Sequence, residues 1–169
     1  MIKKLVTLCC SALLSICAWS QDCNSSIDET AGTSNFTVNG DGTITDNTTG
    51  LMWMVCSLGQ TWSTGACSGD ATLYTWQEAL VAAHGYEFAD YAGWRVPNIK
   101  ELATISERSC VRPAINETLF PSTPSDDFWT STPSTSDATR TWVIAFYNSS
   151  NALKQKTLSV YVRLVRNAD

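Results

Sequence analysis

Five basic residues in the last third of this 169-residue chain could meet an anionic ligand. Guanidinium and ammonium groups bind sulfate and carboxylate oxygens through charge-assisted hydrogen bonds, so a cluster of them would suit a sulfated or otherwise anionic glycan. The alternative is that these cations are scattered over separate strand faces and hydrated, and we favour it for the set as a whole. We assign the first three to a candidate ligand site. The five are Arg140, Lys154, Lys156, Arg163 and Arg166.

Two carboxylates and two aromatic residues complete the candidate ligand site. Asp126 and Asp127 could do acid–base work, but adjacent loop residues usually point apart, and we expect both to face solvent. Trp129 follows this loop, so its ring is the tryptophan best placed to stack on a sugar, and Tyr147 is the second aromatic candidate. The remaining tryptophans of the expected strands and helices are assigned to the core: Trp53, Trp76, Trp94 and Trp142.

Residues 39–46 have the composition of a calcium loop, with Asp, Gly and Ile at offsets similar to those of an EF-hand. The first and twelfth positions of such a loop would be Thr37 and Thr48, which carry no carboxylate, so a hairpin turned at Asp-Gly is the better interpretation. His84 is the only histidine and has no evident nucleophile partner. We therefore predict no metal, no cofactor and no catalytic residue.

Residues 1–20 have the layout of a secretory signal peptide. A basic start precedes a run of ~14 apolar residues, and the small residues Ala18 and Ser20 predict cleavage before Gln21. A membrane-spanning helix needs ~20 apolar residues, which disfavours a retained anchor. Lipid attachment at Cys17 stays open, although a bulky residue precedes it where a lipobox wants a small one. We expect an exported protein in the periplasm, on the cell surface or outside the cell, with no membrane span.

The cysteines that follow the signal peptide form an even set of four in an oxidising compartment. Four cysteines permit three pairings, and we favour Cys56 with Cys67 and Cys23 with Cys110. The first closes a short loop, and the second ties the N-terminal segment to the rest of the chain. The chain contains no Cys-x-x-Cys pair after the signal, which makes a zinc cage a poor alternative.

The charge balance excludes one class of partner. The formal net charge is −5, and removal of two signal-peptide lysines leaves about −7 for the mature chain. Non-specific binding to nucleic acids needs a basic surface, so no nucleic-acid partner is expected.

Beyond the signal peptide we expect an arm over residues 21–35 and one domain over residues 36–169. The arm is rich in Ser, Thr, Asn and Asp, and we expect it to be ordered only if Cys23 pins it. Thr75 can cap a first helix with Glu78 as its capping-box partner, and Asn98 can cap a second over 99–106 with Glu101. Strands are expected at 36–38, 43–46, 51–55, 128–131, 141–147 and 159–166.

The order of these elements indicates the fold class. Strands come first, then two helices, then strands again, without the alternation that a parallel sheet requires. The class is therefore α+β, with a mainly antiparallel sheet, two helices and two disulfides. We expect long irregular loops at 56–71, 118–136 and 147–157, and the last two would contact a ligand.

Five segments, in order, resemble the DUF1566 family, also called the C-terminal domain of the Legionella collagen-like adhesin. The resemblance spans roughly Phe36 to Arg166. The most specific segment is Gly-Trp-Arg-Val-Pro-Asn-Ile-Lys-Glu-Leu at 93–102. The others are 41–53 (Asp-Gly-Thr-Ile-Thr-Asp-Asn-Thr-Thr-Gly-Leu-Met-Trp), 75–80 (Thr-Trp-Gln-Glu-Ala-Leu), 128–131 (Phe-Trp-Thr-Ser) and 162–166 (Val-Arg-Leu-Val-Arg).

The resemblance implies a fold similar to C-type lectins and formylglycine-generating enzymes, in an exported bacterial protein. The adhesin that names the family binds sulfated glycosaminoglycans and assembles as a trimer, so a homotrimer is an expectation for this chain. Formylglycine-generating enzymes need a reactive cysteine pair near the C-terminal end, and no cysteine follows Cys110 here. Calcium-dependent lectins need a glutamate where Val96 precedes Pro97, so their sugar site is not carried over.

We therefore expect a non-enzymatic binding module whose partner in adhesion is a glycan or a cell-surface protein. One alternative is a structural subunit of an envelope or appendage assembly. A second is an unrecognised hydrolase, which would need a cleft holding a carboxylate or His84 with a strongly shifted pKa.

Overall fold

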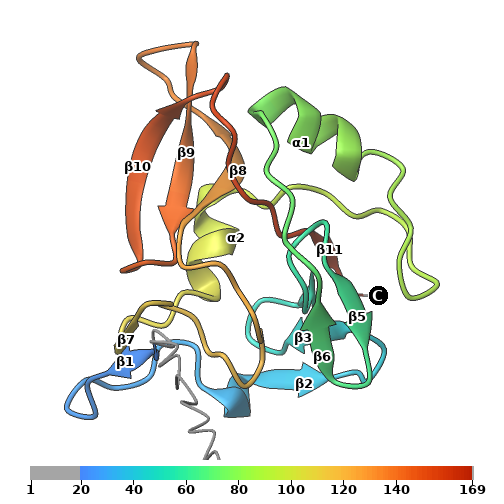
Figure 1. Ribbon diagram of the computed structural model, residues 1–169, viewed down its shortest axis with the longest axis vertical. Coiled ribbons are helices and arrows are strands. Elements are labelled where there is room, and N and C mark those ends of the chain that lie inside the picture. Colours follow the sequence, from blue (N-terminus) through green and yellow to red (C-terminus); the bar gives the residue numbers. More distant parts are fainter. Residues whose placement is uncertain (1–19, 169) are drawn as a thin grey trace, which may run out of the picture.

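The computed structural model describes residues 20–168, which form an α+β fold of short antiparallel sheets and two helices, as the sequence predicts (Figure 1). The signal peptide lies outside these residues except for Ser20. The helices are α1 (Trp76–Ala83) and α2 (Ile99–Thr104), with a 3-10 turn at Thr33–Asn35. The strands are β1 (Asp22–Cys23), β2 (Phe36–Val38), β3 (Thr43–Asp46), β4 (Leu51–Met54), β5 (Thr61–Ser63), β6 (Ala66–Ser68), β7 (Cys110–Val111), β8 (Asp127–Pro133), β9 (Arg140–Ala145), β10 (Ser150–Gln155) and β11 (Val165–Asn167).

Two larger sheets form the frame. One has the strand order β11-β4-β3-β2, and the other β10-β9-β8, with antiparallel pairing throughout both. The β2–β3 pair turns through Asp41 and Gly42, and the Asp41 carboxylate accepts hydrogen bonds from the backbone and hydroxyl of Thr43. Residues 39–46 therefore belong to a hairpin, the interpretation favoured over a calcium loop.

Both helix starts follow their capping signals. Thr75 caps α1 with a complete capping box to Glu78, and Asn98 caps α2 in the same way with Glu101. The second helix ends at Thr104, two residues before the expected end. Its buried Leu102 and the following Ile105 pack with Phe128 of β8, so α2 lies against the three-stranded sheet (Figure 1).

The final segment departs from the expected strand at 159–166. Only Val165 and its two successors form β11, while Val160, Val162 and Leu164 bond to different neighbours. Val160 pairs with Tyr74, and the backbones of Val162 and Leu164 accept bonds from Leu58 and Met54. The segment is buried on both sides because it runs between the two sheets and α1 (Figure 1, dark red).

Two expected loops contain strands instead. β10 occupies most of 147–157 as an edge strand paired with β9, and β5 and β6 form a small hairpin within 56–71. The sequence does not predict β10 because Ser150–Gln155 shows no alternation of apolar residues. The side chains of this strand are largely exposed at the sheet edge. In the third loop, β8 begins at Asp127 and ends at Pro133, so only its flanks are irregular.

Both predicted disulfides are present. Cys56–Cys67 closes the loop that holds β5, and Cys23–Cys110 joins β1 to β7. The arm lies on the body as expected of a pinned segment: Gln21 donates to the carbonyls of Pro113 and Ile115. Within residues 20–168 no helix is long and apolar enough to cross a membrane.

Candidate functional site

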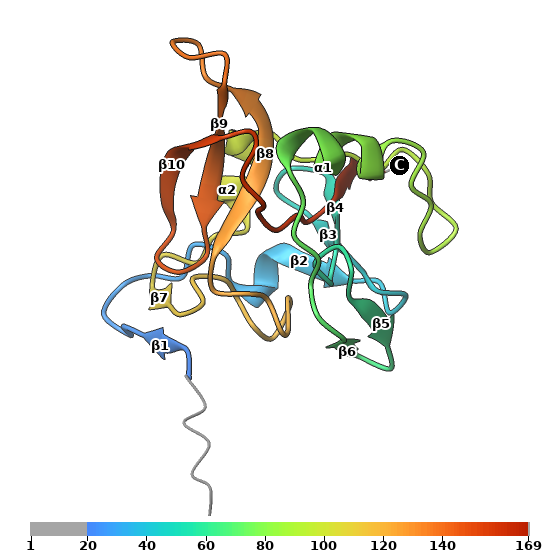
Figure 2. The same cartoon turned by 45° about the horizontal axis from the view of Figure 1, so that its top comes forward.

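Three of the predicted ligand residues lie at one end of the three-stranded sheet, beside the β8–β9 loop. β10 pairs with β9 so that Lys154 lies opposite Thr141 and Gln155 opposite Arg140. The backbone N–H of Lys156 then donates to the carbonyl of Thr139. Figure 2 shows this end of the sheet projecting from the body, far from the β5–β6 hairpin.

Lys156 is the best defined cation of this group. Its ammonium lies 4.2 Å from the ring centroid of Trp76 and donates to the carbonyl of Ala138 at 2.8 Å. The half-buried Trp76 is locked from its other end, because its indole N–H donates to the carbonyl of Thr130 at 2.9 Å. The ammonium is thus held where the start of α1 meets the sheet, which lowers the entropy cost of binding an anion there.

A recess of about 350 Å³ adjoins this cation–π pair, and we call it the Trp76–Lys156 recess. A volume of this size is at the lower end of small-molecule sites and matches one or two sugar rings. Leu80 forms part of its apolar floor, and hydroxyl and amide groups line its edge. Its lining residues are Thr75, Trp76, Gln77, Leu80, Lys156 and Thr157.

Arg140 lies next to this recess along the strand pair. It forms an ion pair with Asp137 at 3.2 Å, and both side chains are more than two-fifths exposed. Bonds from the hydroxyl and backbone of Thr139 lower the pKa of Asp137, with a smaller contribution from Arg140 and Lys156. An exposed ion pair of this kind is weak, so an anionic ligand can take the place of the carboxylate.

The two carboxylates point apart, as adjacent loop residues were expected to do, but the expectation that both face solvent is wrong for Asp127. Asp127 forms an ion pair with Lys154 and is mostly buried, whereas Asp126 is exposed and accepts a bond from the Asp127 backbone. Lys154 is therefore neutralised within the sheet, and only Arg140 and Lys156 are left to face a ligand at this end.

Trp129 does not take part in a surface site. Its ring is fully buried against α1 and the final segment, and its indole N–H donates to the carbonyl of Tyr74 at 2.7 Å. The proposal that it stacks on a sugar is wrong, because its side of β8 is covered by α1 and the final segment rather than facing solvent. Trp53 and Trp94 are buried as predicted, and Trp142 is partly buried.

Tyr147 is exposed but lies at the opposite end of the sheet, in the β9–β10 turn. Its ring contacts the guanidinium of Arg112, 6.0 Å from the centroid. It cannot join Arg140 and Lys156 around one small ligand.

The two remaining cations of the C-terminal third have structural partners, and the expectation of a hydrated surface charge is wrong for Arg163. Arg163 is fully buried, and burial lowers its pKa to about 9, which still leaves it charged at neutral pH. Its guanidinium donates to the carbonyls of Met54 and Val55 and lies over the ring of Phe120. Arg166 packs over the ring of Tyr91.

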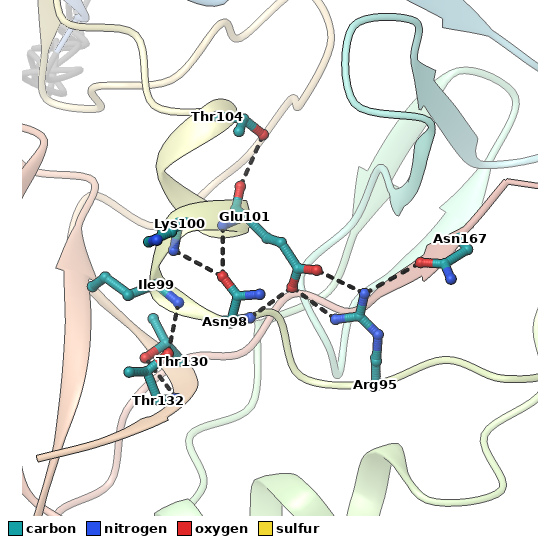
Figure 3. Close-up of polar contacts among 9 residues, drawn as sticks. All are labelled: Arg95, Asn98, Ile99, Lys100, Glu101, Thr104, Thr130, Thr132 and Asn167. Carbon is teal, nitrogen blue, oxygen red and sulfur yellow. Dashed lines mark hydrogen bonds and ion pairs between the residues drawn. The ribbon is translucent and has the colours of Figure 1, made fainter. Parts of the chain in front are cut away.

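The most specific sequence segment forms a helix-start network rather than a ligand site (Figure 3). Arg95 makes a two-pronged ion pair with Glu101 at 2.7 and 2.8 Å, and Glu101 also accepts the backbone N–H of Asn98. Burial raises the pKa of Glu101, but these bonds outweigh it and lower the pKa below the ordinary value. The backbone of Ile99 donates to Thr132, which ties α2 to β8.

Comparison with known protein families identifies the family of this domain. A family model described as the Lcl C-terminal domain matches residues 42–166. The chain belongs to the Lcl C-terminal domain family. The match covers the β3–β4 segment, the Arg95–Glu101 network and the Trp76–Lys156 recess, so all of these are parts of an Lcl C-terminal domain. No curated protein matches the chain.

The sequence predicted only one of the two residues that define the recess of this Lcl C-terminal domain. Lys156 was a candidate, but Trp76 was assigned to the core because it sits on the apolar stripe of α1. Its contact with Lys156 joins residues eighty positions apart, and no local pattern reports such a contact.

Proposed function

We propose that this Lcl C-terminal domain is an exported, non-enzymatic binding module that recognises an anionic glycan through the Trp76–Lys156 recess. The observation that carries the proposal is the immobilised ammonium of Lys156 at the rim of a recess with an apolar floor. Sugar rings present an apolar face and polar edges, and a sulfate or carboxylate group on such a ring would meet the ammonium. The adhesin that gives the family its name binds sulfated glycosaminoglycans, which fits this chemistry.

The binding step requires little rearrangement of the protein. A sulfate oxygen would replace the carbonyl of Ala138 as acceptor for Lys156, a neutral acceptor exchanged for a charged one. Arg140 would contribute a second contact once it releases Asp137. The rest of the mature chain is acidic, so the attraction is local and we expect modest affinity that falls with salt.

Support for export comes from the signal-like residues 1–20 together with the two disulfides. Support for a non-enzymatic role comes from the carboxyl groups of residues 20–168. Wherever the pKa of one of these carboxyl groups is shifted, it is lowered. A lowered pKa favours the ionised form, which accepts hydrogen bonds, whereas a general acid at neutral pH needs a raised pKa.

The test is an array of glycans that includes sulfated glycosaminoglycans, followed by heparin affinity chromatography of variants. We expect Lys156→Ala to elute from heparin at clearly lower salt than the unaltered domain. Lys100→Ala removes the same charge from an exposed position on α2 and should elute unchanged. Equal losses in both variants, or no binding to any anionic glycan, would refute the recess as the site.

A second candidate, a structural subunit that docks on a protein, is supported by one observation. Leu73 and Val81 are 49% and 67% exposed beside a groove on the outer side of α1. Recovery of a stable complex that Val81→Asp abolishes, together with silence on the glycan array, would favour this role. The homotrimer stays a prediction, and the mass of the purified domain from light scattering tests it.

A further inference from the structure

A second cavity, of about 310 Å³, lies on another part of the molecule, where three distant segments meet. We call it the arm cavity. The N-terminal arm, the β3–β4 turn and the end of α2 each supply part of its wall. Its lining residues are Thr30, Asn35, Phe36, Asp46, Thr48, Thr49, Ala103, Thr104, Ser106 and Arg108.

Several polar side chains of the lining already form hydrogen bonds that hold the cavity wall in place. Asp46 is buried, and its carboxylate accepts bonds from the backbones of Thr48 and Thr49 and from the Thr49 hydroxyl. The Thr30 hydroxyl donates to the carbonyl of Ser106 and accepts the backbone N–H of Arg108. These bonds fix the turn and the arm on either side of the cavity before any ligand arrives.

The Thr104 hydroxyl also has a partner, since it donates to the carbonyl of Glu101. The remaining polar side chains of the lining have no protein partner among residues 20–168. The Ser106 side chain is 97% buried, yet its hydroxyl forms no hydrogen bond. A buried hydroxyl without a partner is unfavourable and rare, so it marks a position where a partner can be gained. The amide of Asn35, the hydroxyl of Thr48 and the guanidinium of Arg108 are exposed, and no bond from them occurs within the described part of the chain.

The lining also has one aromatic ring and nearly balanced charge. Phe36 is partly buried and held edge-to-face against Phe120, with ring centroids 6.1 Å apart. Asp46 and Arg108 contribute one charge of each sign, so the cavity has no net preference for an anion or a cation. An aromatic ring, several hydroxyls, an amide and a guanidinium form the usual surroundings of a neutral polyhydroxylated ligand.

We propose that the arm cavity binds one uncharged sugar residue. Arg108 and Asn35 hydrogen-bond its hydroxyls at the mouth, and its apolar ring face packs on Phe36. Ser106 gains its missing partner at the floor. The site is separate from the Trp76–Lys156 recess and does not depend on it, because no residue lines both.

The arm is what makes this site possible. It is held on the body by the Cys23–Cys110 disulfide and by the backbone N–H groups of Thr30 and Ala31, which donate to the Glu107 carboxylate. The arm supplies part of the wall through Thr30 and Asn35, so the disulfide that holds the arm helps to fix the shape of the cavity.

The experiment is an NMR titration of the oxidised mature chain with four neutral probes: the methyl glycosides of glucose, galactose and mannose, and N-acetylglucosamine. We expect at least one probe to cause saturable amide shifts at Thr30, Thr48 and Arg108. Affinity should fall about tenfold or more in Arg108→Ala and in Asn35→Ala, a loss typical of hydrogen bonds to a sugar. Both residues are exposed, so these variants should fold, which their spectra will show.

Two matched controls separate this site from the recess. Lys156→Ala and Lys100→Ala should bind the neutral probe as the unaltered chain does, whatever they do to heparin. The proposal is overturned if none of the four probes gives saturable shifts at the arm cavity. It is also overturned if the shifts persist unchanged in Arg108→Ala and Asn35→Ala.

Discussion

At the scale of single residues, Glu107 shows most clearly how hydrogen bonds offset the cost of burying a charged group in this domain. Its carboxylate is 3% exposed and accepts bonds from Thr30, Ala31 and Ser109. Burial raises the pKa of Glu107, but these bonds outweigh it and lower the pKa below its ordinary value. The charged form is therefore stabilised by folding, and it is this form that holds the arm.

The lowered pKa of Glu107 gives a pH-dependent prediction. Its contribution to stability is present above the unfolded pKa of about 4.3 and is lost as the pH falls through the lower folded pKa. Glu107→Gln should lower the free energy of unfolding at neutral pH by about 1–3 kcal/mol, the range for buried hydrogen bonds to a charged group.

Urea unfolding at several pH values measures this effect. The difference between Glu107→Gln and the unaltered chain should narrow once the pH is well below 4. The control is Glu117→Gln, which removes an exposed carboxylate from a surface groove that Glu107 also lines. This variant should change the free energy of unfolding little. A difference that stays constant across the whole pH range would contradict the role assigned to the Glu107 carboxylate.

Arg163 shows why some residues could not be assigned from the sequence. Its place in an alternating segment suggested a surface cation, but it is fully buried without a carboxylate partner among residues 20–168. It bonds the end of β4 through Met54 and reaches Thr123 in a distant loop. Only the three-dimensional meeting of these segments creates a place for a buried guanidinium.

At the scale of elements, local sequence signals were sufficient to predict where the helices begin but not where the edge strands of the sheets lie. Thr75 and Asn98 mark both helix starts, because a capping box is a contact between residues three positions apart. β10 has no such local signal, since an exposed edge strand needs no apolar alternation. Trp129 was misplaced although its strand was expected, because α1 and the final segment that cover it lie far away in the sequence.

The cap of α2 gives a prediction at this scale. The Asn98 side chain accepts bonds from the backbones of Lys100 and Glu101 at 2.9 and 3.0 Å. Asn98→Ala should destabilise the domain by about 1 kcal/mol, whereas Asn98→Asp keeps a capping oxygen and should be nearly neutral. Thermal unfolding compares the two, and equal destabilisation by both would show that the side chain does more than cap α2.

The whole molecule combines two proposed binding surfaces with one frame. The backbone of the final segment joins the two larger sheets, and the disulfides fix the arm and the β5–β6 hairpin. On this frame the Trp76–Lys156 recess and the arm cavity are lined by different elements. The fold class, both disulfides and the family were predictable from composition and motifs; neither binding surface was, because each depends on contacts between distant segments.

The acidic character of the whole chain sharpens the test of its proposed function. An overall charge of about −7 after the signal is removed opposes an anionic ligand at long range, so binding must come from the local ammonium of Lys156. Lys156→Met keeps an apolar side chain over Trp76 and removes only the charge. It therefore isolates the electrostatic contribution of the recess.

The most direct measurement is the dissociation constant of a heparin oligosaccharide for the mature domain and for Lys156→Met, at low and moderate salt. We predict that Lys156→Met binds about tenfold more weakly at low salt, and that the two proteins converge as salt screens the charge. Equal dissociation constants at low salt would contradict a glycan site at the Trp76–Lys156 recess.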